Sequence, residues 1–167
     1  YDKKIKLLRS HGIERGKKHW KYQINHTGFN FRLSDLCCSL GISQLKRINK
    51  FIEKRRSIAK IYDNYFKSYE HLYTPYLSKK NISSYHLYPI RINFEKIKKS
   101  KDQLINFLMK KKIKLQFHYI PIIEFNYFKR KYNLKLKNYP NTKKFYNQVV
   151  SLPIYFELTT GKLKSIL

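Results

Sequence analysis

The feature that most constrains the fold is a run of apolar residues at helical spacing between Leu33 and Tyr69. Lysines and arginines fall between them, as on the solvated face of an amphipathic helix. Gly41 interrupts this pattern without ending it. A helix of this length in a chain of 167 residues predicts a strut between two domains. The apolar positions are Leu36, Leu40, Leu45, Ile48, Ile52, Ala59, Tyr62 and Phe66.

The sequence after this helix predicts a small unit of strand, helix and strand. Residues 84–94 have the composition of a strand, and Pro89 would place that strand at a sheet edge or at a bulge. Residues 101–113 carry the apolar side of a short helix that Ser100 can cap. Residues 114–123 alternate as a second strand. This order favours an α/β arrangement.

The segment before the long helix combines polar groups with aromatic ones. Gly28 opens a turn, and Asn30 and Arg32 follow, flanked by phenylalanines. Ser34 is placed to cap the helix, because its hydroxyl can accept a hydrogen bond from an unpaired amide of the first turn. Polar groups just before a helix start are well placed to meet a phosphate. An ordinary loop-to-helix junction, with Asn30 in a turn, is the alternative.

Basic residues greatly outnumber acidic ones, 37 against 10, which gives a net charge of +27. Such a charge favours nucleic acid or another anionic surface as a partner. The aromatic and basic stretch 127–139 could serve as a surface for single strands, although no RNA-binding motif accompanies it. A skewed genome is the alternative explanation, since Lys, Asn, Ile, Tyr and Phe, which have A- and T-rich codons, are all abundant.

The remaining composition points away from membranes and metals. No apolar run approaches the length needed to cross a bilayer. No histidine shows metal-ligand spacing with a cysteine or carboxylate, so no metal site is predicted. The adjacent Cys37 and Cys38 are expected to be small packing residues in a reducing cytoplasm. The chain begins at Tyr1 without an initiator Met, and its end reads as a helix just begun, so it is expected to be a piece of a longer protein.

Several motifs together resemble one enzyme family. The motif Gly28-Phe-Asn-Phe-Arg32, followed by Leu40-Gly-Ile-Ser-Gln-Leu45, is similar to the segment after the cofactor lysine in the DegT/DnrJ/EryC1/StrS aminotransferases. Further motifs follow in the family's order, and the resemblance covers nearly the whole chain. They are Leu8-Arg-Ser-His-Gly-Ile13, the stretch 51–62, His86-Leu-Tyr-Pro-Ile90, Gln116-Phe-His-Tyr-Ile-Pro121 and Ser151-Leu-Pro153.

This resemblance implies a fold and an activity. The family consists of pyridoxal 5'-phosphate (PLP) enzymes that aminate nucleotide-linked 4-keto-6-deoxy sugars. The chain would be an α/β protein, the C-terminal portion of a fold-type I PLP-dependent transferase with an α+β small domain. Residues 1–32 would be the tail end of the PLP-binding large domain, 33–70 a linking helix and 71–167 the small domain.

The resemblance also implies a pathway and partners. The loop at 8–13 and the segment 116–121 resemble most closely the branch that makes pseudaminic acid precursors, the UDP-4-amino-4,6-dideoxy-N-acetyl-β-L-altrosamine transaminases. The family implies a cytoplasmic homodimer, with a nucleotide sugar as substrate and glutamate as amino donor. A basic nucleic-acid-binding protein and an inactive aminotransferase remnant remain the alternatives.

The same resemblance assigns binding residues to this chain. Asn30 would reach the cofactor phosphate of the other subunit. Gln116, Phe117, His118 and Tyr119 would line the sugar-nucleotide site, with a hydrogen bond from His118 to the substrate or, alternatively, only a structural role for this histidine. The lysine that forms a Schiff base with the cofactor is expected upstream of Tyr1, so no catalytic residue is assigned and the chain alone would be inactive.

The long helix carries a further expectation. Part of its apolar face would meet residues of the large domain that are absent from this chain. Leu36, Leu40, Leu45, Ile48 and Ile52 are therefore predicted not to be all buried.

Overall fold

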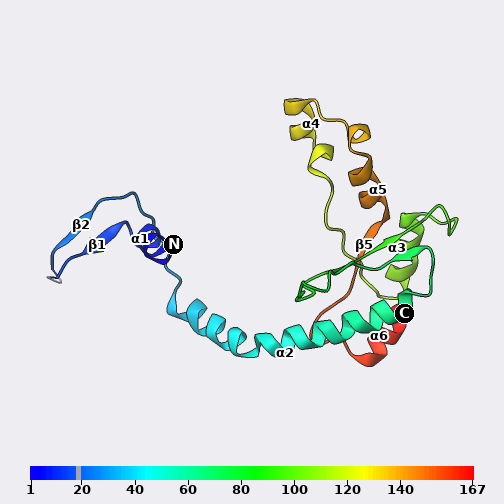
Figure 1. Ribbon diagram of the computed structural model, residues 1–167, viewed down its shortest axis with the longest axis horizontal. Coiled ribbons are helices and arrows are strands. Elements are labelled where there is room, and N and C mark those ends of the chain that lie inside the picture. The colour runs from blue at the N-terminus through cyan, green and yellow to red at the C-terminus, as the bar shows by residue number, and fades with distance from the viewer. Residues whose placement is uncertain (18–19) are drawn as a thin grey trace. The chain divides into compact units, whose positions relative to one another are not determined.

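The computed structural model describes residues 1–17 and 20–167, and it divides into two compact units. The first unit is 1–48 and the second is 49–167. Their boundary falls inside the long helix α2, Asp35–Phe66 (Figure 1).

The first unit combines a short helix with a two-stranded antiparallel sheet. Helix α1, Asp2–Arg9, leads into β1, Ile13–Arg15, which pairs with β2, Tyr22–Ile24. The chain then returns, and Ser10 and Asn30 form an antiparallel bridge. The loop that resembles a family motif is therefore joined through its backbone to the segment that carries Asn30.

Gly12 and Gly28 lie where the backbone after α1 comes into contact with the backbone after β2. Gly12 has a φ of +68°, a conformation that L side chains rarely adopt. A Cβ at Gly28 would collide with the backbone nitrogen of Gly12, and a Cβ at Gly12 would collide with the carbonyl oxygen of His26. Neither position accepts a side chain without moving the backbone.

The predicted long helix is confirmed, and it begins where the sequence places its cap. The backbone N–H of Cys37 donates to the Ser34 hydroxyl oxygen at 3.4 Å. The helix continues through Gly41. Its buried residues are Ile58, Ala59, Tyr62 and Phe66, which lie on one stripe of its C-terminal part.

The N-terminal half of α2 has an exposed apolar face, as predicted. Leu36 is 81% exposed, Leu40 63% and Leu45 69%. Ile48 is also exposed, and Ile52 is partly buried. The prediction that Cys37 and Cys38 are packing residues is wrong for this chain, because both are exposed on the same bare half of the helix.

The core of the second unit lies between α2 and a three-stranded antiparallel sheet of order β3-β4-β5. The strands are β3, Leu72–Tyr73, β4, Tyr88–Ile92, and β5, Val149–Leu152. Alternate residues of β4 are buried, whereas all of β5 is buried. The sheet therefore presents one face to α2 and leaves β5 covered on both faces.

Two core tyrosines keep their hydroxyls hydrogen-bonded. Tyr62 donates to the Pro153 carbonyl oxygen at 2.7 Å, and Tyr88 donates to the Asp63 carboxylate. Burial raises the pKa of both hydroxyls above the ordinary tyrosine value. Both side chains therefore add apolar area to the core without leaving a polar atom unpaired.

Helices and turns complete the second unit around the sheet. The cap predicted at Ser100 is confirmed as a capping box: the Ser100 hydroxyl accepts from the Gln103 N–H, and the Gln103 side chain accepts from the Ser100 N–H. The other elements are η1, Ile122–Glu124, α4, Asn126–Tyr132, η2, Leu136–Asn138, α5, Pro140–Gln148, and α6, Thr160–Ile166. The helix that Ser100 caps is α3, Lys101–Lys110.

The strand predicted at 114–123 is wrong, because only Gln116 pairs with the sheet, through one bridge to Ser151. Ile113 and Leu115 are buried, but Phe117, Tyr119 and the residues that follow are exposed or only partly buried. No residue from 116 to 123 is buried, and the chain forms a 3-10 helix at Ile122–Glu124. The unit is otherwise the predicted mixture of helices with a small sheet.

Within the part of the chain that the structure describes, no helix is long and apolar enough to cross a membrane.

Candidate functional site

The candidate cofactor contact, Asn30, is exposed in the first unit and is held by its backbone neighbours. The Phe31 N–H donates to the Arg9 carbonyl oxygen, and the His11 N–H donates to the Phe29 carbonyl oxygen, both at 2.9 Å. The rings of Phe29 and Phe31 stack at 4.9 Å between centroids. The bridge and the stacked rings together fix the backbone from which the Asn30 side chain extends.

Asn30 forms a hydrogen-bond pair with Arg32. The Arg32 guanidinium Nε donates to Asn30 Oδ1 at 3.3 Å. Within residues 1–17 and 20–167, the Asn30 amide nitrogen has no hydrogen-bond partner. The pair thus combines an amide donor without a partner with a cation, and both suit a phosphate oxygen.

The candidate substrate segment, 116–119, contacts strand β5 at Ser151. The Gln116 and Ser151 backbones exchange hydrogen bonds of 3.1 and 2.8 Å. The Ser151 hydroxyl lies 3.0 Å from His118 Nδ1, and Ser151 is only 2% exposed. Ser151 therefore orients the imidazole ring, and His118 Nε2 has no hydrogen-bond partner within the described residues.

Phe117 lies in a different environment from His118. Its ring lies under the ammonium group of Lys101, 5.2 Å from the ring centroid. Tyr119 is 75% exposed, and its ring meets the edge of the His118 ring at 4.8 Å. The structure thus brings His118 and Tyr119 together, whereas Phe117 packs against α3.

The five predicted residues fall in both units. Asn30 belongs to the first unit, and Gln116, Phe117, His118 and Tyr119 belong to the second. Each group is therefore described by the contacts within its own unit.

Two residues that contact segment 116–119, Ser151 and Lys101, were not predicted to do so from the sequence. A signal for Ser151 was present, because this serine interrupts the apolar run Val149–Leu152 and must find a partner if that strand is buried. For Lys101 the sequence offers no comparable signal, since it is one of 37 basic residues.

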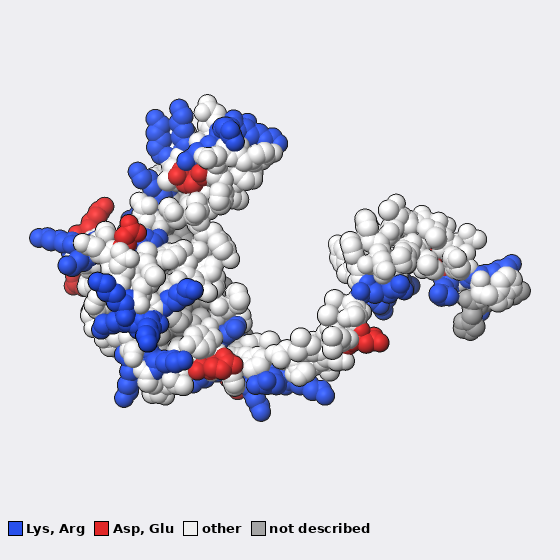
Figure 2. Space-filling view, turned by 180° about the vertical axis from the view of Figure 1, so that it is seen from behind, with Lys and Arg blue, Asp and Glu red and all other residues white. Residues whose placement is uncertain are grey.

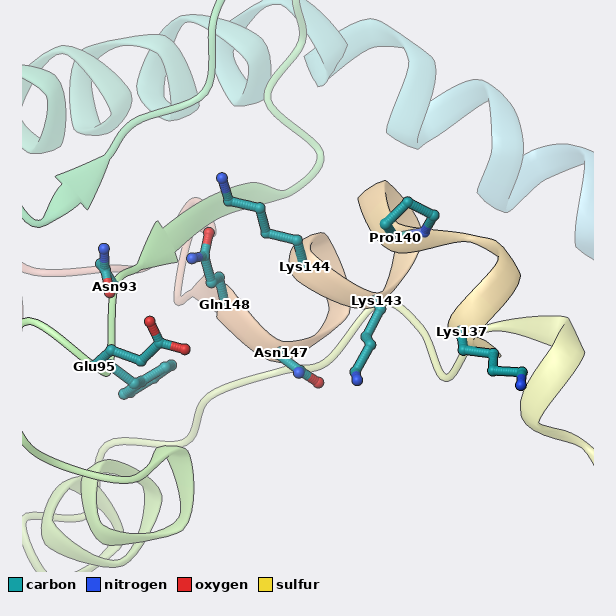
Figure 3. A pocket seen from close by; sticks show the side chains of 9 residues that line it. Asn93, Glu95, Lys137, Pro140, Lys143, Lys144, Asn147 and Gln148 are labelled. Atoms are coloured by element: carbon teal, nitrogen blue, oxygen red, sulfur yellow. The ribbon is translucent and has the colours of Figure 1, made fainter. Parts of the chain in front are cut away.

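Of two surface hollows beside α5, one borders the candidate segment and the other does not. A hollow of about 570 Å³ is lined by Lys101, Phe117, Ile120 and Tyr146, among others. The other, of about 510 Å³, is lined by lysines of η2 and α5 and, at its far end, by Asn93 and Glu95 after β4 (Figure 3). None of the predicted site residues lines this second hollow, so it has no part in the candidate site.

Within the described residues no group of three His, Cys, Asp or Glu side chains could hold a metal ion.

Comparisons with known proteins give one consistent result. The sequence model of the DegT/DnrJ/EryC1/StrS aminotransferase family matches residues 1–167. A UDP-4-amino-4,6-dideoxy-N-acetyl-beta-L-altrosamine transaminase from Campylobacter jejuni is 38% identical over 164 residues, which are 98% of this chain and 42% of that protein.

Solved structures agree with the sequence comparison. Helicobacter pylori PseC, an aminotransferase involved in the biosynthesis of pseudoaminic acid, has a TM-score of 0.81 and 33% identity, over 98% of this chain and 43% of that one. The PLP form of Spr1654 from Streptococcus pneumoniae has a TM-score of 0.80 and 25% identity, over 98% of this chain and 41% of that one. The chain thus spans less than half the length of these relatives.

Proposed function

The chain belongs to the DegT/DnrJ/EryC1/StrS aminotransferase family, and from that premise we propose that it forms the C-terminal part of a PLP-dependent enzyme that aminates a nucleotide-linked 4-keto-6-deoxy sugar. The observation that carries the proposal is the match over 98% of the chain, at 38% identity, to a UDP-4-amino-4,6-dideoxy-N-acetyl-beta-L-altrosamine transaminase. Pseudaminic acid or a related surface glycan is the proposed end product. Glutamate is the proposed amino donor, and the cytoplasm is the proposed location.

We assign three parts of the chain to this enzyme. Residues 1–32 are the end of the PLP-binding large domain, 33–70 are the linking helix and 71–167 are the small domain. The exposed apolar half of α2 supports this division, because an unpartnered face of that kind suits contact with a further part of a protein.

Asn30 is assigned to the phosphate of PLP bound mainly by the other subunit of a homodimer. When bound, PLP supplies the electron sink for amino transfer. The residues of this chain fit only its phosphate end, where the Asn30 amide donates a hydrogen bond and the Arg32 guanidinium lies beside it. The lysine and carboxylate that hold the rest of PLP are expected upstream of Tyr1.

Segment 116–119 is assigned to the sugar nucleotide. Because Ser151 holds Nδ1 of His118, Nε2 remains available for a sugar hydroxyl or a phosphate oxygen. The exposed ring of Tyr119 and the Gln116 side chain would extend the same surface. In this role His118 binds and orients substrate rather than moving a proton.

A nucleic-acid-binding function has less support. A binding footprint should gather basic side chains on one face or arm. On the side that Figure 2 draws, lysines and arginines lie in several groups with uncharged surface between them. The steep loss of affinity with rising salt that counterion release demands would identify such binding if single-stranded DNA were titrated.

The test of the site uses a longer polypeptide that contains this chain and the sequence upstream of Tyr1. Asn30→Ala should weaken PLP binding about 10- to 150-fold, because a charged oxygen loses a donor whose hydrogen bond contributes about 1.5–3 kcal/mol. Turnover at saturating PLP should change much less. Unchanged PLP affinity would remove Asn30 from the cofactor site.

A mixing experiment separates the two subunits. Asn30→Ala chains are mixed with chains that lack the cofactor lysine, and activity is measured at limiting PLP. If Asn30 acts on the partner's cofactor, one site of each mixed dimer has both defects and the other has neither, so activity returns. No recovery in dimers shown to exchange would rule out action across subunits.

A further inference from the structure

Lys101 makes three contacts that join α3 to α5 and to segment 116–119. Its ammonium nitrogen donates to the Tyr146 carbonyl oxygen at 2.8 Å. The same nitrogen lies 5.1 Å from the centroid of the Tyr146 ring and 5.2 Å from that of the Phe117 ring. Each ring lies within cation–π distance. One side chain therefore connects three parts of the second unit.

Lys101 stands at an unfavourable position for a cation. It is the first residue of α3, where the positive end of the helix dipole disfavours a positive charge. It is also about half-buried, and burial lowers the pKa of its ammonium group, although the nearby Asp102 carboxylate raises it. The capping box at Ser100 already begins this helix without help from Lys101. The helix does not need a lysine here, so its contacts offer the better reason for it.

Segment 116–119 is therefore contacted by two side chains, Ser151 of β5 and Lys101 of α3. On one side, Ser151 pairs with the Gln116 backbone and with the His118 ring. On the other side, Lys101 covers the ring of Phe117, which is 39% exposed and therefore not held by the core. Phe117 lies between Gln116 and His118 in the chain, so its contact with Lys101 adds to the contacts that Ser151 makes with both neighbours.

We propose that Lys101 is a positioning residue that holds Phe117 and so keeps His118 in place for the sugar nucleotide. This inference rests on the proposed function of segment 116–119. Lys101 itself touches no reacting atom. Its effect passes through Phe117 to the neighbouring His118.

The first test uses the chain of 167 residues and needs no enzymatic activity. Nuclear magnetic resonance signals of the His118 ring and of the amides of 116–119 are compared in the wild type, Lys101→Met and Lys101→Arg. Lys110→Met is the matched control, because Lys110 is exposed in the last turn of the same helix. Lys101→Met should shift or broaden these signals, while Lys101→Arg, which keeps a cation over the rings, and Lys110→Met should leave them near their wild-type positions.

The second test uses the longer polypeptide with PLP. Lys101→Met should raise the KM for the sugar nucleotide about three- to tenfold, which corresponds to losing about one cation–π contact. Neither kcat nor the KM for the amino donor should change much, and Lys101→Arg should restore the KM.

The outcomes separate this inference from the proposed function. If the wild type transfers no amino group but the signals of 116–119 respond to Lys101→Met alone, the support stands and the proposed function fails. If amino transfer is normal and Lys101→Met leaves both the signals and the KM unchanged, the inference is overturned. A failure of Lys101→Arg to restore either would overturn the role of the cation.

Discussion

The buried hydroxyl of Tyr62 shows how single polar atoms fix the core of the second unit. Its hydrogen bond to the Pro153 carbonyl oxygen connects α2 to the end of β5 across 91 positions of sequence. Removing the hydroxyl leaves that carbonyl without this donor, whereas the ring still packs. The loss should equal one net hydrogen bond with little loss of apolar burial.

Tyr62→Phe should therefore lower the free energy of unfolding by about 1 kcal/mol. The measurement is a urea titration of the chain. Tyr76→Phe is the control, since Tyr76 is 92% exposed, and it should change stability very little. An equal loss in both variants would contradict the structural role given to Tyr62.

The contribution of Lys101 to the free energy of unfolding should depend on pH. Its pKa is lowered in the folded chain from an ordinary value of 10.5, mainly because burial disfavours the charge. Between the folded and unfolded pKa values, the unfolded chain binds more protons at this residue, so its contribution to stability rises as pH rises. The Asp102 carboxylate, which follows it in α3, opposes this effect by raising the pKa, and the Tyr146 ring faces the ammonium group from α5.

Subtracting the stability of Lys101→Met from that of the wild type isolates this residue from the other lysines. The difference should be flat near neutral pH and should shift in favour of the wild type as pH rises toward 10.5. Denaturant titrations at several pH values provide the measurement. A difference that falls over this range would contradict the lowered pKa.

At the scale of elements, α2 has two halves with different roles. Ile58 is 1% exposed, whereas Leu40 is 63% exposed on the same helix. Apolar burial stabilises only where atoms leave water. The C-terminal half therefore supports the second unit, and the N-terminal half contributes an apolar face without a partner in the described residues.

Ile58→Ala should destabilise the chain by about 2–5 kcal/mol, whereas Leu40→Gln should stay within about 0.5 kcal/mol of the wild type. Thermal or denaturant unfolding of the isolated chain compares the two. In the longer polypeptide, Leu40→Gln should become destabilising if the large domain covers this face. A large loss for Leu40→Gln in the isolated chain would show that the face is already buried.

The elements also show what the sequence could and could not predict. The long helix and the caps at Ser34 and Ser100 depend on spacing and local hydrogen bonds, so the residues themselves indicate them. The prediction of a strand at 114–123 was wrong because alternation of apolar and polar residues indicates a strand only where one face is buried. In this segment no residue after Leu115 is buried.

The position of Pro89 in the sheet also could not be predicted from local sequence alone. The sequence predicts an edge or a bulge there, yet β4 is the central strand. The named strand β3 pairs only with Arg91 and Ile92, so β4 has a partner strand on one side alone at Pro89. The proline thus stands where a central strand is locally an edge, which depends on the length of β3 and not on local sequence.

For the candidate site, motifs in the sequence predicted the binding residues but not the residues that hold them in place. Asn30 and His118 stand in motifs that resemble the family's, whereas the contacts of Ser151 and Lys101 join positions 33 and 45 residues apart. Such pairings arise from the tertiary fold, and no local pattern contains them.

For the whole molecule, we propose that this chain is part of a PLP-dependent sugar aminotransferase. The most direct measurement is amino transfer by the polypeptide that contains this chain and the sequence upstream of Tyr1, purified with PLP. We expect equimolar bound PLP and glutamate-dependent conversion of a UDP-linked 4-keto-6-deoxy sugar to its 4-amino form. A folded polypeptide that retains no PLP and transfers no amino group to that sugar would contradict it.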